Sequence, residues 1–124
     1  MPIKTYAKGA RHERDLLHIL TKRGFSCIRA ASSGGWLTPA DIVAIKKGLV
    51  IAIESKAWNK MPRLSKDKIR DFQEWCRQAS AIGILAWKPP QDKWKMILLS
   101  HIADGNYDEE MWLSMDDVLN AVDI

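Results

Sequence analysis

Apolar positions along the chain follow two different periods, which predict its helices and strands. Three segments repeat apolar side chains at helical spacing: residues 9–23, 65–80 and 115–122. Strand patterns cover residues 25–30, 82–87 and 94–99, and the two β-branched runs that flank Lys47-Gly48. The helix over 65–80 joins two strands as a right-handed crossover requires. This order predicts an α/β protein whose residues 1–124 form a single domain.

Residues that favour helix ends mark the limits of these helices. Gly24 is suited to follow the first helix, because glycine adopts the left-handed backbone found there. Ser65 and Ser114 are good N-caps for the second and third helices. The expected buried stripe of the second helix comprises Ile69, Phe72, Trp75 and Cys76.

The hairpin predicted around Lys47-Gly48 carries the candidate chemistry. Asp41 and Glu54 are equally far from this two-residue loop, so they face each other with Cβ atoms about 4.5–5.5 Å apart. Strand alternation places Lys56 on the same face and Ser55 on the other. Opposed like charges destabilise a sheet unless a cation neutralises them. The pattern is typical of a metal-dependent phosphodiesterase; the alternative is a turn acid at Asp41 and a chance Glu-x-Lys triplet.

Glu13 lies on the apolar stripe of the first helix, three and four residues before Leu16 and Leu17. A carboxylate on a packed stripe is costly unless it is paired. We therefore expect Glu13 to join the site, the alternative being a helix-edge carboxylate that extends into solvent. The candidate ligands are oxygens, and the three histidines are spread out. This donor set favours Mg²⁺ or Mn²⁺ over zinc.

Charge is distributed unevenly along the chain. The first 102 residues carry all 19 Lys and Arg but only 8 of the 15 acids, a net charge of +11. The last 22 residues carry the other 7 acids and no Lys or Arg. A basic body suggests a polyanionic partner, most simply nucleic acid, rather than an ordinary solvated surface. The residues expected to follow phosphates are Lys4, Lys8, Arg11, Lys60, Arg63, Lys66 and Arg70.

Two observations bear on the cellular setting. No apolar run approaches the roughly 20 residues of a membrane span, and no secretory leader is recognisable. We therefore expect an intracellular, cytoplasmic protein without a membrane partner. Cys27 and Cys76 each lie in an apolar segment and are expected to be free thiols, in preference to a disulfide.

A set of short motifs runs from about residue 6 to residue 87. They are Gly9-Ala10 with Glu13-Arg14, Gly24-Phe25, Arg29-Ala30, Ser33-Gly34, Asp41 and Glu54-x-Lys56. Together they resemble the archaeal Holliday junction resolvases, a family within the PD-(D/E)xK class of nucleases. One departure is Ala40, which separates Pro39 from Asp41, whereas the family often has Pro and Asp adjacent.

The resemblance implies a restriction-endonuclease-like fold, in which a central mixed β-sheet is flanked by helices. It also implies Mg²⁺-dependent paired nicking of a four-way DNA junction by a homodimer, in DNA recombination and repair. The family's acidic and lysine positions fall on Glu13, Asp41, Glu54 and Lys56. Its basic residues near the scissile phosphate fall on Arg14 and Arg29. Its loop serine falls on Ser33, or on Ser32 if the loop register differs.

The expected reaction is hydrolysis by a metal-activated water. Asp41, Glu54 and the Ser55 carbonyl are expected to hold one or two metal ions, and Glu13 to complete the outer ligation or contact a second ion. Lys56 is expected to orient the nucleophile or to stabilise the transition state. One alternative is another nuclease of this class, acting in repair, replication or restriction. The other is a noncatalytic DNA-binding protein, against which the intact acid pair and lysine argue.

Paired cuts need two active sites, and a twofold homodimer supplies them at a fixed distance. The chain contains 6 Trp, more than a small core readily encloses. We therefore expect an apolar interface away from the basic surface. Its candidate members are Phe72 and Trp75 on the second helix and Trp87 and Trp94 on the strands.

Overall fold

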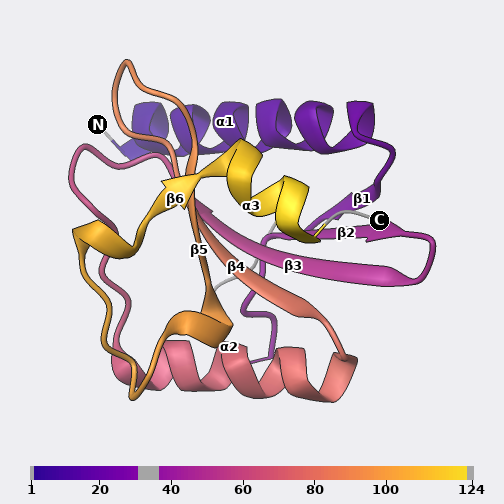
Figure 1. Cartoon of the computed structure of the whole chain (residues 1–124). Helices are drawn as coiled ribbons and strands as arrows, with labels where there is room; N and C mark the ends of the chain where they lie inside the picture. The colour runs from indigo at the N-terminus through magenta and orange to yellow at the C-terminus, as the bar shows by residue number, and fades with distance from the viewer. Residues whose placement is uncertain (1, 31–36, 123–124) are drawn as a thin grey trace.

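The computed structural model describes residues 2–30 and 37–122, with side chains from Gly9 onward. Within these residues a helix is followed by three strands, a second helix, two strands, two short 3-10 helices, a last strand and a last helix (Figure 1). The helices are α1 (Pro2–Lys22), α2 (Lys66–Ala79) and α3 (Met115–Val122). The strands are β1 (Ser26–Arg29), β2 (Ile42–Lys46), β3 (Leu49–Lys56), β4 (Ile82–Trp87), β5 (Lys95–Leu98) and β6 (Leu113–Ser114). Two short 3-10 helices, η1 (Leu99–His101) and η2 (Glu109–Met111), lie between β5 and β6.

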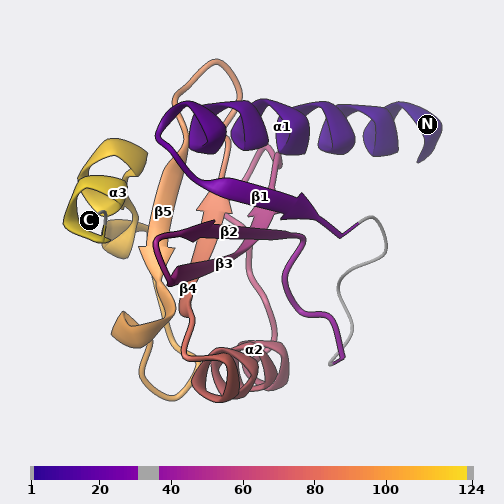
Figure 2. The same cartoon turned by 90° about the vertical axis from the view of Figure 1, so that its right-hand side faces the viewer.

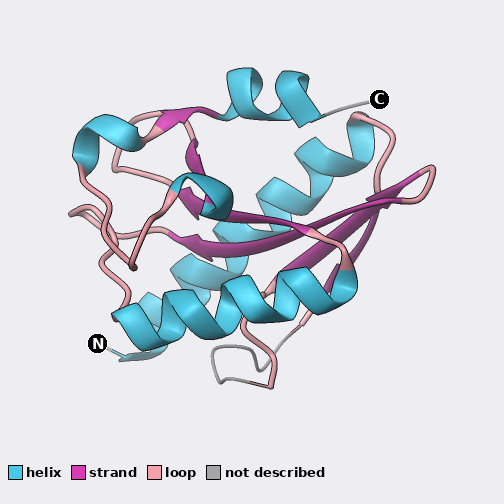
Figure 3. Cartoon of the chain, turned by 60° about the horizontal axis from the view of Figure 1, so that its bottom comes forward, coloured by secondary structure: helices cyan, strands magenta, loops and turns pink. Residues whose placement is uncertain are grey.

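The strands form one sheet in chain order, from β1 to β6. β3 and β4 are parallel, and the other neighbouring pairs are antiparallel. α2 connects the parallel pair, as such a connection requires. α1 and α3 cover one face of the sheet and α2 covers the other (Figure 2 and Figure 3). The α/β architecture and the mixed sheet predicted from the sequence are confirmed.

The predicted helix ends are confirmed with one exception. Ser65 and Ser114 each accept a backbone hydrogen bond of 3.1 Å from the first turn of the helix they precede. Gly24 follows α1 with a φ of 95°, a conformation that glycine adopts without steric cost. The start of the first helix is wrong, because α1 begins at Pro2 and not at Gly9. Proline is tolerated in a first turn, and apolar periodicity does not detect such a turn.

The hairpin between β2 and β3 has the predicted loop. Lys47 and Gly48 adopt φ angles of 50° and 86°, as a two-residue turn with positive φ at both positions requires. The register runs from this loop to the pair formed by Ile42 and Ile53. The start of β2 and the end of β3 therefore lie side by side, which positions the candidate acids.

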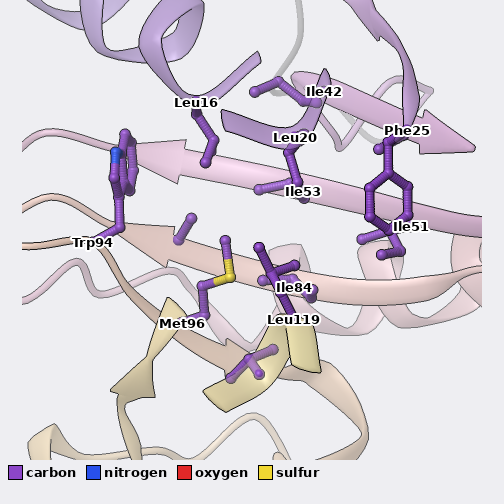
Figure 4. Packing of buried hydrophobic residues seen from close by; sticks show 13 residues of the cluster. Leu16, Leu20, Phe25, Ile42, Ile51, Ile53, Ile84, Trp94, Met96 and Leu119 are labelled. Carbon is purple, nitrogen blue, oxygen red and sulfur yellow. The ribbon is translucent and has the colours of Figure 1, made fainter. Parts of the chain in front are cut away.

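Each face of the sheet has its own hydrophobic core. The core beneath α1 and α3 includes Leu16, Leu20, Ile51, Ile53, Met96 and Leu119 (Figure 4). The core beneath α2 includes Ile69, Phe72, Cys76, Leu85 and Trp112. Cys27 and Cys76 are free, as predicted, and burial raises the pKa of the Cys76 thiol to about 11.

The aromatic residues expected at a dimer interface lie mostly inside the protein. Phe72, Trp87 and Trp94 are 1%, 5% and 5% exposed and belong to the two cores. That interface prediction is therefore wrong for these three residues, while Trp75 is half-buried against the core beneath α2. Two cores, one on each face, accommodate more large aromatic side chains than one core would.

The region after β5 contains structure that was not predicted. β6 consists of two residues paired with Lys95 and Met96, too short to show a period. In the part of the chain that the structure describes, no helix is both long and apolar enough to cross a membrane.

Candidate active site

Asp41 and Glu54 meet where β2 begins and β3 ends. Both are buried, with 3% and 8% of their surfaces exposed. The Asp41 carboxylate accepts a hydrogen bond from the Ser55 N–H at 3.0 Å and another from the Ser55 Oγ at 3.1 Å. Burial, followed by the neighbouring Glu54, raises the pKa of Asp41 to about 9. Burial likewise raises the pKa of Glu54. Because burial disfavours the charge of both carboxylates and Glu54 further disfavours the charge of Asp41, the pair makes a strong site for a cation.

The position of Asp41 differs in one respect from the predicted pairing. The Asp41 N–H donates to the Ile53 carbonyl at 2.9 Å, one residue out of the register that would place Asp41 directly opposite Glu54. Asp41 precedes β2 and is not part of the strand. Its carboxylate consequently reaches both Glu54 and Ser55, although strand alternation points those two side chains to opposite faces.

Lys56 lies beside the acid pair, as the Glu-x-Lys spacing predicted. Its Nζ is 3.9 Å from Glu54 Oε1, and its side chain is 29% exposed. Lys68, on α2, also lowers the pKa of Glu54 by its positive charge. Two ammonium groups therefore face Glu54 on the α2 side of the sheet.

Glu13 approaches the acid pair from the opposite face. Arg29 holds it with two hydrogen bonds to Oε2, of 3.1 Å from Nε and 2.9 Å from Nη2. Glu13 raises the pKa values of both Asp41 and Glu54, so its charge acts on the pair. The prediction that Glu13 is paired and close to the other acids is consistent with these contacts, although its immediate partner is Arg29.

The candidate metal ligands are Asp41, Glu54 and a backbone carbonyl. In the described residues no three His, Cys, Asp or Glu side chains converge as a metal cluster, and Arg29 is the group that contacts Glu13. The Lys56 carbonyl accepts a hydrogen bond from the N–H of Lys88, which directly follows β4. Alternation along β3 then turns the Ser55 N–H and carbonyl toward Asp41. The resulting set of oxygens suits Mg²⁺ or Mn²⁺.

Arg29, one of the residues predicted to contact DNA, is bound to Glu13, and the others are found in three settings. Lys60 and Arg63 line a hollow with Trp58, whose ring centroid lies 5.2 Å from Lys56 Nζ. Exposed positions on α1 and α2 are occupied by Arg11, Arg14, Lys66 and Arg70. The side chains of Lys4 and Lys8, and the whole of Ser32 and Ser33, lie outside the part that the structure describes.

Two residues near the site were missed in the sequence. Lys68 immediately precedes Ile69 and is four residues before Phe72, which places it at the border of the buried stripe. Trp58 follows Lys56 by two residues, and its ring centroid is 5.2 Å from the Lys56 Nζ. An aromatic residue among Lys56, Asn59 and Lys60 was the available signal.

The mixed sheet, the buried acid pair and the Glu-x-Lys spacing are those of a PD-(D/E)xK nuclease. Comparison with known proteins is more specific. The family model described as archaeal Holliday junction resolvase (Hjc) matches residues 4–123. The chain belongs to this family.

Individual relatives agree with this assignment. The crossover junction endodeoxyribonuclease Hjc of Archaeoglobus fulgidus is 41% identical over 91 residues, which cover 72% of this chain and 67% of the relative. The crossover junction endodeoxyribonuclease Hje of Saccharolobus islandicus is 26% identical over 93% of this chain and 89% of its own length. The solved structure of the A. fulgidus protein, a Holliday junction resolvase, has a TM-score of 0.73 and 32% identity, with coverage of 89% of this chain and 98% of its own.

Proposed function

We propose that this chain is a metal-dependent endonuclease that resolves four-way DNA junctions by paired nicks. The single observation that carries the proposal is the buried Asp41–Glu54 pair, with Lys56 beside it. A fold alone does not define a reaction, whereas two desolvated carboxylates with an adjacent ammonium suit metal-assisted phosphodiester hydrolysis. The activity named for the A. fulgidus and S. islandicus relatives supports the same substrate.

Each residue of the site has a distinct role in this reaction. Asp41, Glu54 and the Ser55 carbonyl would hold Mg²⁺, or Mn²⁺ in its place. When bound, the ion supplies a Lewis acid and lowers the pKa of water. Ser55 fixes the Asp41 carboxylate through two hydrogen bonds, so the ligand is oriented before DNA arrives. Lys56 donates to the phosphate oxygens as negative charge develops.

Glu13 and Arg29 contribute charge from the α1 side of the sheet. Glu13 adds negative potential at the acid pair, which favours a cation there and supports an outer-shell role. Arg29 keeps Glu13 at a fixed position and brings a guanidinium to the edge where the scissile phosphate would lie. Arg14, exposed on the same helix, would contact the DNA backbone.

Cleavage of a four-way junction, compared with a linear duplex of the same sequence, tests the proposed activity. Wild-type protein with Mg²⁺ should nick the junction symmetrically and leave the duplex largely intact. Asp41→Asn should bind the junction with nearly wild-type affinity and nick it at no measurable rate. Equal cleavage of both substrates would indicate another nuclease of the class, and binding without metal-dependent cleavage by wild type would indicate a noncatalytic protein.

We also propose a homodimer, with an interface on the outer part of the sheet. Ile28 and Ile45 are 65% and 39% exposed. They lie on the α2 side of the sheet, because Cys27 and Ala44 beside them pack on the α1 side. Val43 and Val50, their cross-strand neighbours, are only half-buried. An uncovered apolar face of this kind is typical of a protein–protein interface.

Sedimentation equilibrium at micromolar concentration tests the dimer. Wild-type protein should have about twice the chain mass of 14.1 kDa. Ile28→Glu should be monomeric, because an isologous interface would bury the introduced carboxylate of each subunit without a partner. Leu113→Glu is the matched control, since Leu113 is a similarly exposed apolar residue on β6. A dimer that Ile28→Glu leaves intact would exclude this face.

A further inference from the structure

A hollow of about 590 Å³ opens beside the active site and is not explained by the chemistry of the acid pair. Its lining includes Trp58, Asn59, Lys60, Arg63, Trp87 and Glu109. Aromatic surface together with basic side chains is the combination that binds the bases and the phosphates of unpaired nucleic acid.

Trp58 is the unusual member of this lining. It is 44% exposed, in contrast to Trp87, Trp94 and Trp112, which are at most 8% exposed. It belongs to neither hydrophobic core. Its backbone is nevertheless fixed, because the Trp58 carbonyl accepts a hydrogen bond of 2.9 Å from Nε1 of the buried Trp87. With its backbone fixed, the indole has only the freedom of its two side-chain torsions to lose when a ligand stacks on it.

Lys56 connects this indole to the acid pair. Its Nζ lies 3.9 Å from Glu54 Oε1 and 5.2 Å from the centroid of the Trp58 ring. One side chain therefore extends from the candidate metal ligands to the aromatic surface. A base stacked on Trp58 would belong to a nucleotide next to the phosphate held at the acid pair.

The charges of the hollow suit one nucleotide better than a long backbone. Lys60 and Arg63 are exposed and would contact a phosphate. Glu109, from η2, is also exposed in the lining. Its carboxylate repels phosphates but accepts hydrogen bonds from the exocyclic amino group of a base.

We propose that Trp58 is a stacking platform for a nucleobase exposed at the branch point, adjacent to the scissile phosphate. The inference rests on the proposed function and adds a basis for substrate selection. In a continuous duplex each base is already stacked, and removing one costs a few kcal/mol, whereas an unpaired or disturbed base costs least. The platform therefore favours DNA whose stacking is interrupted, as at a junction, over linear duplex.

Binding should be measured in the Asp41→Asn background without metal, so that the result does not depend on cleavage. Adding Trp58→Ala should weaken junction binding about 5- to 150-fold, the equivalent of the ~1–3 kcal/mol lost when a stacking aromatic is replaced by alanine. Trp58→Phe should recover most of this loss. Affinity for linear duplex should change less than about twofold. A junction with 2-aminopurine at the branch-point position beside the cut should show a fluorescence change that requires Trp58.

A variant in the same hollow separates stacking from charge. Glu109→Gln removes a negative charge but keeps an oxygen that can accept a hydrogen bond from a base, so it should tighten binding of junction and duplex alike, with an effect that disappears as salt is raised. The Trp58→Ala loss should persist at high salt. Far-ultraviolet circular dichroism and thermal unfolding should confirm that each variant is folded.

Two outcomes would contradict the proposed stacking role of Trp58. Equal losses of junction and duplex affinity would make Trp58 a general DNA contact. Unchanged affinity in the Asp41→Asn background, combined with slower cleavage by the Trp58→Ala single variant with Mg²⁺, would limit the ring to orienting Lys56. Failure of the proposed function has a different signature, because wild-type protein would then not nick junctions whatever residue occupies position 58.

Discussion

Replacing Asp41 by Asn should stabilise the metal-free protein while it abolishes cleavage. Asp41 is 3% exposed, and burial and Glu54 raise its pKa from the ordinary 3.8 to about 9. At neutral pH the native state then holds a proton that the unfolded chain has released. Its contribution to stability is complete below the unfolded pKa and decreases as the pH rises toward the folded pKa. Asparagine does not titrate, so the variant escapes this decrease.

The size of the effect follows from the pKa displacement. Each unit corresponds to about 1.36 kcal/mol. Lys56 and Lys68 offset negative charge at the pair, and the proton is divided between Asp41 and Glu54. We therefore assign to Asp41 alone a pKa difference of about one to two between the folded and unfolded states. The gain for Asp41→Asn at pH 8 is then about 1.4–2.7 kcal/mol. With about 2.1 cal/mol/K of unfolding entropy per residue, this raises the Tm by roughly 5–10 °C. The Asn carbonyl can still accept the hydrogen bond from the Ser55 N–H.

Calorimetry in a metal chelator tests this reasoning at fixed protein concentration. The Tm difference between Asp41→Asn and wild type should be small near pH 4 and largest near pH 8. Added Mg²⁺ should stabilise wild type and not the variant, because only wild type has the ligand. Asp15→Asn, an exposed substitution on α1, should change little at either pH. A variant with no advantage at pH 8, or a larger advantage at pH 4, would refute the account of a charge-disfavouring acid pair.

Four further outcomes are expected. Lys56→Ala should lower the single-turnover rate about 10²–10³-fold, as loss of one transition-state donor does, with little change in junction affinity by gel shift; an unchanged rate would remove Lys56 from the mechanism. Junction affinity should fall with salt at a log–log slope of about −0.9 per neutralised phosphate, and a flat response would exclude the basic surface as the DNA contact. Gly83→Ala should destabilise by about 1–3 kcal/mol in denaturant titration, because a Cβ there would collide with Leu99 and lie 2.8 Å from Cys76 Sγ. Gly9→Ala, in open space on α1, should instead stabilise by about 0.5–1 kcal/mol.

Much of the fold could be predicted from short sequence patterns. The hairpin loop at Lys47-Gly48 and the caps at Ser65 and Ser114 each depend on a few neighbouring residues, and all are present. The strand Ile82–Trp87 has the predicted bounds, because turn residues limit it on both sides. Once the hairpin register is known, the proximity of the acids at its open end follows from counting.

Other features depend on contacts that a local pattern does not contain. The Asp41 N–H donates a hydrogen bond to the Ile53 carbonyl, so Asp41 is out of register with β3. No apolar periodicity indicates that β2 begins at Ile42 and not at Asp41. Periodicity also does not distinguish a Trp that fills a core from one that remains exposed. Trp94 is buried and Trp58 is exposed. The difference depends on which helices and loops cover each position.

The displacement of Asp41 from the strand has a functional consequence. An aspartate paired within β2 would point to one face of the sheet only. It could then contact either Glu54 or Ser55, which lie on opposite faces, but not both. Because Asp41 lies just before the strand, its carboxylate contacts Ser55 and still interacts with Glu54. Glu13 acts on the pair from the α1 side, and Lys56 and Lys68 act from the α2 side. The edge of the sheet thus brings together charges from both faces. The buried acids lower the stability of the metal-free native state, and a cation bound at this position would reverse that loss.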